Sequence, residues 1–197
     1  MKQNIVGQVV LIVPFRNRVA QLPIFLYNIH LFLQNQGVAY GVILVEPHSK
    51  NTFNRAKLLN IGYVEGFKLY GDWDCIIFHD VDIIPKNYGN HYKCGSKPKL
   101  LSSVVKKAIW THYRVKYRNY MGGAIAVKPE YHKKINGFSN DYWGWGKEDD
   151  DYAHRLIRFG NFSLTRTRIE YGKVLMLPHI DRGEKKNAVN PCGKQLL

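Results

Sequence analysis

Residues 75–82 read Cys75-Ile76-Ile77-Phe78-His79-Asp80-Val81-Asp82, an apolar run followed at once by two carboxylates. The apolar residues 75–78 have the length and composition of a buried strand. Alternate side chains of an extended segment point to opposite sides, so Asp80 and Asp82 face one way and Val81 faces the other. In a parallel sheet both carboxylates then lie at the carboxyl ends of the strands, where α/β folds bind their ligands.

The segments before this strand alternate between strand and helix patterns. Apolar runs at residues 9–13 and 42–45 predict two further buried strands, and helical patterns cover residues 19–34 and 54–70. In the second helix, apolar side chains recur every three or four residues: Ala56, Leu59, Tyr63, Phe67 and Tyr70. A β-α-β-α-β order predicts an α/β fold with a mostly parallel central sheet flanked by helices.

The rest of the chain has weaker patterns. Residues 86–119 are rich in lysine and interrupted by glycine and proline, so we expect them to be largely irregular. A strand is predicted at residues 122–127, followed by a short helix after Pro129. A further helix is predicted to begin at Glu148 and to end at Gly160.

The composition excludes a disordered tail and favours anionic ligands. Of the 197 residues, 45% are apolar, which is enough for a hydrophobic core. The sequence has 29 lysines and arginines against 15 aspartates and glutamates, a formal charge of +14. Nucleic acid, nucleotide-sugars, sulfated glycans and anionic membranes all fit this charge. No apolar segment approaches the ~18 residues of a membrane span, and no signal peptide is visible.

The Asp80-Val81-Asp82 triplet has two interpretations. Two carboxylates one residue apart can hold a hard divalent cation and leave coordination positions for phosphate oxygens. They can also end a strand by accepting hydrogen bonds from backbone amides, which is the commoner role of an isolated triplet. The neighbouring loops of the same sheet edge must therefore decide between them.

Two of these loops carry arginine. Residues 14–18 read Pro14-Phe15-Arg16-Asn17-Arg18 and follow the first strand, where the two guanidinium groups suit a diphosphate or a uracil ring. Residues 53–55 read Phe53-Asn54-Arg55 and precede a helix, whose first amides attract anions. In isolation, the first is equally a solvated helix start and the second is a plain helix cap. Beside the acidic triplet, both favour an anionic ligand.

Residues 143–151 are the most specific segment and read Trp143-Gly144-Trp145-Gly146-Lys147-Glu148-Asp149-Asp150-Asp151. Tryptophan faces bind sugar rings, and an adjacent carboxylate can act as general base toward a sugar hydroxyl. Four acids at a helix start also suit the helix dipole. That structural role alone does not require glycines beside both tryptophans. The segment therefore favours a sugar site.

Four motifs together resemble the β-1,4-galactosyltransferase family, glycosyltransferase family 7. They are Phe53-Asn54-Arg55-Ala56-Lys57-Leu58-Leu59-Asn60, the Asp80-Val81-Asp82 triplet, Tyr120-Met121-Gly122-Gly123 and residues 143–151, in the order and approximate spacing of the family. The resemblance extends from about Val9 to Pro191. It implies a GT-A type nucleotide-sugar-binding fold in a single catalytic domain. Residues 1–128 would bind the nucleotide-sugar, and residues 129–197 would complete the acceptor and metal sites.

The resemblance also implies residue roles. Asp82, Met176 and His179 match the Mn²⁺ ligands of the family, although a thioether is an unusual ligand for this cation. From chemistry alone, Met176 is a core residue and His179 a surface imidazole. Asp149 matches the catalytic base and Asp150 the acid that holds the acceptor sugar. The residues that match the donor site are Pro14, Phe15, Arg16, Arg18, Phe53, Arg55, Asp80, Val81, Gly123, Trp145 and Glu148.

The activity implied by the resemblance is transfer of galactose from UDP-galactose, with inversion, to a terminal sugar hydroxyl. N-acetylglucosamine is the expected acceptor and a β-1,4 linkage the product. Tyr120 favours galactose, because in the family a bulky ring at this position crowds an N-acetyl group. The alternatives are N-acetylgalactosamine as donor, xylose as acceptor, or a module that binds glycan or nucleic acid without turnover. For the enzyme we expect no nucleic-acid partner, and the sequence does not indicate the oligomeric state.

The three cysteines fit no zinc-binding spacing. Cys75 and Cys94 match a disulfide of the family, which leaves Cys192 unpaired within the chain and implies an oxidising compartment, the Golgi lumen. The family usually has a membrane anchor and stem before the catalytic domain, and a lid that closes near the position of Pro191. The chain is therefore expected to be a fragment or an unusually short member. Lys147 stands where the family commonly has glycine.

Overall fold

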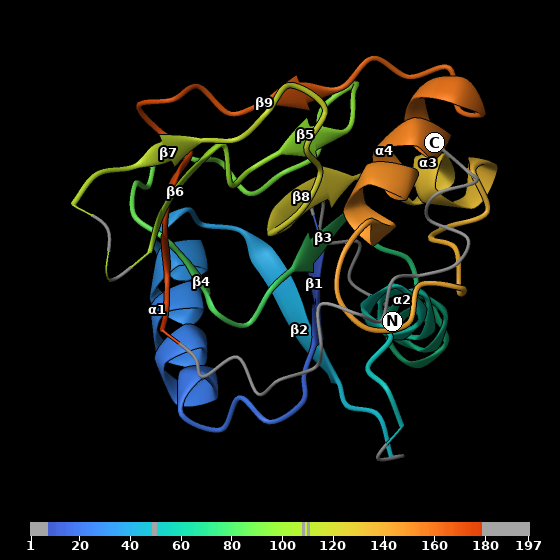
Figure 1. Ribbon diagram of the computed structural model, residues 1–197, viewed down its shortest axis with the longest axis horizontal. Coiled ribbons are helices and arrows are strands. Elements are labelled where there is room, and N and C mark those ends of the chain that lie inside the picture. Colours follow the sequence, from blue (N-terminus) through green and yellow to red (C-terminus); the bar gives the residue numbers. More distant parts are fainter. Residues whose placement is uncertain (1–7, 49–50, 108, 110, 179–197) are drawn as a thin grey trace.

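Two β-sheets and four helices make up the computed structural model, which describes residues 8–48, 51–107, 109 and 111–178 (Figure 1). In spatial order, the larger sheet contains β2 (Ala39–Val45), β1 (Gln8–Pro14), β3 (Cys75–His79), β8 (Ala124–Val127), β5 (Lys99–Leu100) and β9 (Thr165–Arg166). The smaller sheet contains β4 (Ile83–Pro85), β10 (Lys173–Met176), β6 (Val104–Lys107) and β7 (Arg114–Val115). The helices are α1 (Gln21–Asn35), α2 (Arg55–Tyr70), α3 (Pro129–Lys134) and α4 (Glu148–Arg158).

The predicted β-α-β-α-β unit is confirmed. β1 pairs in parallel with both β2 and β3, and α1 and α2 are the crossovers between them. β8 then pairs antiparallel with β3 and with β5, while β9 lies parallel to β5. The larger sheet is therefore mixed, with its parallel half at the N-terminal end of the chain.

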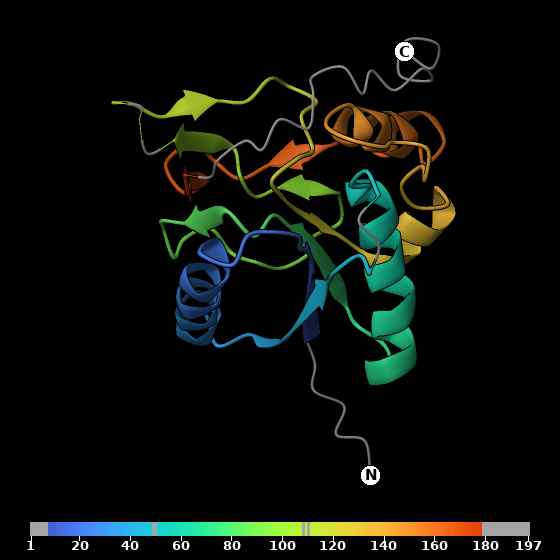
Figure 2. The ribbon, with the colours of Figure 1, turned by 60° about the horizontal axis from the view of Figure 1, so that its bottom comes forward.

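The two faces of the larger sheet carry different helices (Figure 2). Val9, Leu11 and Val13 of β1 pack on the same side as the buried residues of α1. Val10 and Ile12 of β1 point to the other side, into a core that also contains buried residues of α2 and α4. Because alternate residues of β1 serve both cores, nearly the whole strand is apolar, as its sequence shows.

The strand predicted at residues 42–45 is confirmed, but the prediction that this strand is buried is wrong. β2 forms there, but among its residues only Val45 is buried. β2 is the edge strand of the sheet, so it has a neighbour on one side only. An apolar run of four residues does not distinguish an edge strand from a central one.

The predicted apolar stripe of α2 is confirmed except at Tyr70: Ala56 and Leu59 are buried, and Tyr63 and Phe67 pack against the same core. Two glycines add to this contact. Tyr70 is 64% exposed, whereas Gly62 and Gly66 are buried against the sheet. A Cβ atom on Gly66 would lie 2.5 Å from Ile43 Cδ1, and one on Gly62 would overlap Ile12 Cγ2. These glycines set how closely α2 approaches the sheet. The search for apolar periodicity considers apolar side chains only. It therefore does not detect a contact that depends on glycine, which has no side chain.

Most of the described residues between 86 and 119 are irregular, as expected, but three short strands lie among them. β5, β6 and β7 lie in this region, although each has only two to four residues. β5 pairs with β8 and β9, and β6 pairs with β10 and β7. Most of these partners come from distant parts of the chain, so the local sequence carries no alternating pattern that would reveal the strands. No helix in the described part of the chain is long and apolar enough to cross a membrane.

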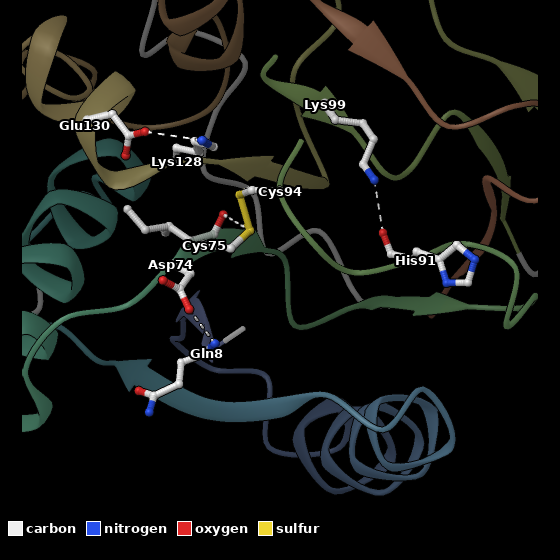
Figure 3. Close-up of a disulfide and its surroundings, with 9 residues drawn as sticks. Gln8, Asp74, Cys75, His91, Cys94, Lys99, Lys128 and Glu130 are labelled. Carbon is white, nitrogen blue, oxygen red and sulfur yellow. Dashed lines mark hydrogen bonds and ion pairs between the residues drawn. A yellow bond between two sulfur atoms is a disulfide. The ribbon is translucent and has the colours of Figure 1, made fainter. Parts of the chain in front are cut away.

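A disulfide joins Cys75 at the start of β3 to Cys94 (Figure 3). This confirms the pairing implied by the family resemblance. Cys192 lies outside the described residues. The loop that the bridge closes contains the Asp80-Val81-Asp82 triplet, so the bridge restricts the chain on both sides of the triplet.

The double substitution Cys75→Ala, Cys94→Ala is expected to lower the free energy of unfolding by ~3 kcal/mol, because it releases a loop with a sequence separation of 19 residues. Urea unfolding of the oxidised protein and of the variant measures the difference. Lys97→Ala, three residues beyond the bridge, is the control, since Lys97 is exposed and its loss should change the stability by less than about 0.5 kcal/mol. Equal stability of the double variant and the control would refute a stabilising bridge.

Candidate functional site

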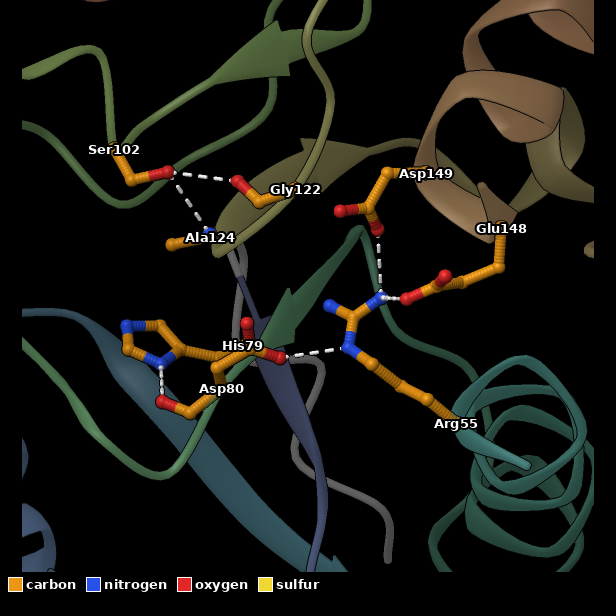
Figure 4. A network of polar contacts seen from close by, with 8 residues as sticks. All are labelled: Arg55, His79, Asp80, Ser102, Gly122, Ala124, Glu148 and Asp149. Atoms are coloured by element: carbon orange, nitrogen blue, oxygen red, sulfur yellow. Dashed lines mark hydrogen bonds and ion pairs between the residues drawn. The ribbon is translucent and has the colours of Figure 1, made fainter. Parts of the chain in front are cut away.

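A cluster of four charged side chains lies at the carboxyl end of β3 (Figure 4). Arg55 opens α2, Asp80 directly follows β3, and Glu148 and Asp149 open α4. All four were assigned to the site from sequence, as donor-binding residues and catalytic base. The structure brings them together from three separate segments.

Arg55 is the centre of this cluster. Its Nε donates a hydrogen bond to Asp80 Oδ1 at 2.7 Å, and its Nη1 donates to Asp149 Oδ1 at 2.8 Å. Glu148 Oε1 lies 3.5 Å from the same Nη1. Burial would lower the pKa of Arg55, but the three surrounding carboxylates together raise it. The guanidinium therefore stays charged and holds the three acids in fixed positions.

Two carboxylates of the cluster, those of Asp149 and Asp80, have raised pKa values. Burial raises the pKa of Asp149 well above its ordinary value; Arg55 opposes this rise, and the charges of Glu148 and Asp80 add to it. Burial likewise raises the pKa of Asp80 to about 6, against the lowering effect of Arg55. A carboxylate with a raised pKa accepts a proton more readily near neutral pH. Asp149 thus has the electrostatic environment of a general base.

Gly122 and Gly123 let the chain pass close to the cluster. Gly123 has a φ of +79°, which favours glycine, and its carbonyl accepts a hydrogen bond of 2.8 Å from the Asp80 amide. A Cβ atom on Gly122 would overlap Asp149 Oδ2 and lie 2.5 Å from the Tyr120 hydroxyl oxygen. The Tyr120 hydroxyl and the second oxygen of Asp149 therefore border the same glycine. This places Tyr120 beside the predicted base.

Ser102 supports this backbone and was missed by the sequence analysis. Its Oγ donates to the Gly122 carbonyl at 2.8 Å and accepts from the Ala124 amide at 3.1 Å. Ser102 is fully buried. A single serine in a region expected to be irregular gives no sequence signal for such a role.

Tyr117 was also missed, and it contacts the predicted acceptor residue. Its hydroxyl donates a hydrogen bond to Asp150 Oδ1, and its ring meets the ring of Tyr120 edge to face at 5.2 Å. Arg166 donates to the carbonyls of Lys116, Tyr117 and Arg118 and so fixes this loop. The link between Asp150 and Tyr117 spans 33 residues, which local sequence patterns do not report.

The aromatic loop before α4 has an unusual backbone. Gly144, Gly146 and Lys147 all have positive φ values, and Lys147 is the residue directly before the helix. The Gly144 amide donates to the Phe53 carbonyl at 2.7 Å, which ties the loop to the start of α2. The side chain of Trp145 is 85% exposed. The predicted sugar platform is therefore open to solvent.

The first arginine loop lies at the end of β1. The Arg16 guanidinium carbon lies 4.7 Å from the centre of the Phe53 ring, and its Nη1 donates to the Asn51 carbonyl at 2.6 Å. The carbonyl of Arg18 accepts hydrogen bonds from the first turn of α1, and its side chain is partly exposed. Three other predicted donor residues, Pro14, Phe15 and Val81, are buried. Their side chains pack in the fold.

Two of the three predicted metal ligands lie on neighbouring segments. β10 pairs antiparallel with β4 and sets Met176 opposite Ile83, the residue after Asp82. The Leu177 amide donates to the Asp82 carbonyl at 2.7 Å. His179 lies outside the described residues. Among the described residues no three His, Cys, Asp or Glu side chains form a metal-binding cluster. One carboxylate and one thioether alone make an incomplete site, and an imidazole three residues after Met176 would fit it.

Comparisons with known proteins find similarity to galactosyltransferases over almost the whole chain. Residues 4–95 match the family model for the N-terminal region of glycosyl transferase group 7, and residues 103–180 match that for the N-terminal domain of galactosyltransferase. β-1,4-Galactosyltransferase 4 of Cricetulus griseus is 44% identical over 192 residues, covering 98% of this chain and 54% of that protein. β-1,4-Galactosyltransferase 1 of Bos taurus is 42% identical, covering 93% and 44%. The chain spans about half the length of these curated relatives.

Solved structures agree with the predicted GT-A fold. A mutant of Drosophila β-1,4-galactosyltransferase 7 in complex with manganese, UDP-Gal and xylobiose has a TM-score of 0.73 and 34% identity, covering 83% of this chain and 66% of that one. GalNAc-T7 with UDP, GalNAc and Mn²⁺ has a TM-score of 0.58 at 9% identity, covering 91% and 45%. The second likeness concerns the fold alone.

Proposed function

This chain belongs to glycosyltransferase group 7, and from that premise we propose that it is a manganese-dependent β-1,4-galactosyltransferase. The reaction is transfer of galactose from UDP-galactose, with inversion, to a terminal sugar hydroxyl, with N-acetylglucosamine as the expected acceptor. The observation that carries this proposal is the cluster in which Arg55 holds Asp80, Glu148 and Asp149 at the carboxyl end of the sheet.

Asp149 is the general base of the proposed reaction. Arg55 binds its Oδ1 and fixes the orientation of the carboxylate, while its Oδ2 borders Gly122. Asp149 removes the proton of the acceptor hydroxyl as that oxygen attacks the anomeric carbon of galactose. The bond between the anomeric carbon and the diphosphate breaks, and its electron pair leaves with UDP. One displacement inverts the anomeric centre, so one base suffices.

The donor and acceptor lie on different parts of the proposed site. Arg16 and Arg18 suit the anionic donor, and Asp82, Met176 and His179 would hold Mn²⁺, which offsets negative charge on the leaving UDP when bound. Asp150, oriented by Tyr117, accepts a hydrogen bond from the acceptor sugar. The exposed face of Trp145 packs on the ring of the same sugar. Residues 1–128 thus bind the nucleotide-sugar, and residues 129–197 complete the acceptor and metal sites.

The assay that tests this proposal measures UDP release from UDP-galactose, with and without Mn²⁺ and N-acetylglucosamine. We expect release that requires both additions. Binding of glycan without UDP release in any combination would identify a non-catalytic module instead. The Cys75–Cys94 bridge supports a lumenal compartment of the secretory pathway, which localisation of the tagged chain would test.

Tyr120→Leu is expected to admit UDP-N-acetylgalactosamine as a donor. The Tyr120 hydroxyl borders Gly122 beside the base, so removing it makes room for an N-acetyl group. Relief of such a steric conflict should shift the ratio of kcat/KM for the two donors by roughly 10- to 200-fold. Both donors are compared on both proteins with one acceptor.

Tyr113→Leu is the matched control for this comparison. The Tyr113 ring lies near the amino groups of Lys106 and Lys173, at 6.0 and 5.7 Å, on the smaller sheet, and its loss should leave the donor ratio unchanged. If the wild type already prefers UDP-N-acetylgalactosamine, the galactose assignment is wrong. If Tyr120→Leu leaves the ratio unchanged, Tyr120 does not select the donor.

A further inference from the structure

We propose that Asn161 is an N-glycosylation site and that the neighbouring Phe159 ring packs against the first sugar. Asn161-Phe162-Ser163 is the only Asn-x-Ser/Thr triplet among the 197 residues, and its middle residue is not proline. This triplet is the acceptor signal for N-linked glycans in proteins of the secretory pathway. The disulfide between Cys75 and Cys94 is independent support for an oxidising compartment.

The triplet lies in a defined surface turn at the end of α4. The Gly160 amide donates to the Arg155 carbonyl and the Phe162 amide donates to the Leu156 carbonyl, each at 3.0 Å. Asn161 has a φ of +56°, a left-handed conformation that asparagine tolerates better than most residues. The turn is therefore held by backbone bonds, and glycan attachment would not require it to open.

The two side chains of the triplet that an oligosaccharyltransferase recognises are accessible. Asn161 and Ser163 are both exposed. The co-substrate would be an oligosaccharide carried on a lipid diphosphate. The Asn161 Nδ2 forms a bond to the anomeric carbon, and the bond from that carbon to the diphosphate oxygen breaks. The electron pair leaves with the lipid diphosphate, and the amide proton passes to a base of the transferase.

Phe159 gives the attached sugar a place to pack. Its side chain is 72% exposed, although it is a large apolar ring at the end of a helix. Gly160 is the single residue between Phe159 and Asn161, and it has no side chain that would separate the ring from the sugar. The C–H face of a pyranose on this ring would remove apolar surface of both partners from water. Glycosylation should therefore stabilise the fold.

The proposed glycan lies away from the catalytic cluster. Glu148 and Asp149 begin α4, whereas Asn161 follows its last residue, Arg158. The rise of an α-helix places its two ends about 16 Å apart. The glycan is thus remote from the base, and its attachment is independent of the proposed galactosyltransferase activity.

The attachment is tested by secreting the full chain from a eukaryotic host as wild type, Ser163→Ala and Ser163→Thr. We expect wild type and Ser163→Thr to migrate as heavier species that peptide N-glycosidase converts to the lighter one. Ser163→Ala should migrate as the lighter species without treatment, since it keeps Asn161 and its turn. Mass spectrometry should locate the resulting Asn-to-Asp conversion at position 161. Secreted wild type that the glycosidase leaves unchanged would overturn the proposal.

The role of Phe159 is tested by melting each protein before and after removal of the glycan. For wild type we expect the glycosylated form to unfold about 2 to 4 °C higher. In Phe159→Ser this difference should disappear, because the ring is gone. Leu69→Ser is the matched control, since Leu69 is 71% exposed on α2 and its loss should preserve the difference. An unchanged difference in Phe159→Ser would exclude packing of the sugar on this ring.

Discussion

Replacing Asp149 with asparagine is expected to lower kcat by about 10²- to 10⁴-fold, the usual contribution of a positioned general base. The amide keeps the size of the carboxylate and can still accept a hydrogen bond from Arg55 Nη1. It has no basic oxygen to take the proton of the acceptor hydroxyl. Initial-rate measurements with saturating donor, acceptor and Mn²⁺ give the change in kcat.

Asp151→Asn is the matched control, because it places the same substitution in the same helical turn. Asp151 accepts a hydrogen bond of 2.9 Å from Arg155 Nε, and it takes no part in the Arg55 cluster. We expect kcat of this variant to stay within a few-fold of wild type. Thermal melting of both variants shows whether the fold is intact. A near-normal kcat for folded Asp149→Asn would remove the residue from the role of base.

The pH dependence of the wild type gives a second check of Asp149. The pKa of Asp149 is raised mainly by burial, so its carboxylate becomes protonated at a higher pH than that of an ordinary aspartate. The basic form is present above this raised pKa and is lost as the pH falls through it. As the pH is lowered, we therefore expect kcat to fall at a higher pH than it would if the base were an aspartate with an ordinary pKa.

Replacing Asp82 with asparagine is expected to abolish both Mn²⁺ binding and activity. An amide oxygen carries no charge to offset a divalent cation. Loss of an outer-shell partner typically weakens metal affinity ~10- to 100-fold, and loss of a charged ligand should exceed this. Titration of Mn²⁺ followed by electron paramagnetic resonance measures binding separately from turnover.

Asp74→Asn serves as the control for this variant. Asp74 is exposed and lies directly before β3, at the opposite end of this strand from Asp82. Its carboxylate accepts a hydrogen bond of 2.9 Å from the backbone amide of Gln8. Its replacement should leave Mn²⁺ affinity unchanged. Near-normal turnover of Asp82→Asn at saturating Mn²⁺ would contradict the metal assignment. Lost turnover with normal Mn²⁺ affinity would move Asp82 from metal binding to another role.

Much of the fold follows from local sequence. The apolar runs of β1 and β3 and the helical periodicity between them are properties of short segments, and each segment has a period that indicates its structure. Asn54 shows the same for a helix start, since its side chain accepts the Lys57 amide as a helix cap does. The run of apolar residues before Asp80 also placed this carboxylate correctly at the carboxyl end of a buried strand. The roles of Asp149, Met176 and the cysteine pair came instead from the family resemblance.

Only the tertiary structure determined which side chains from distant parts of the sequence contact each other. Arg55 joins Asp149 across 94 residues, and Tyr117 joins Asp150 across 33, so no local period records either pair. The glycines of α2 face the sheet because a close approach needs an absent side chain. β10 brings Met176 beside the segment of Asp82 by strand pairing alone. Sequence patterns report which structure a segment forms, whereas the partners of a side chain depend on where distant segments pack.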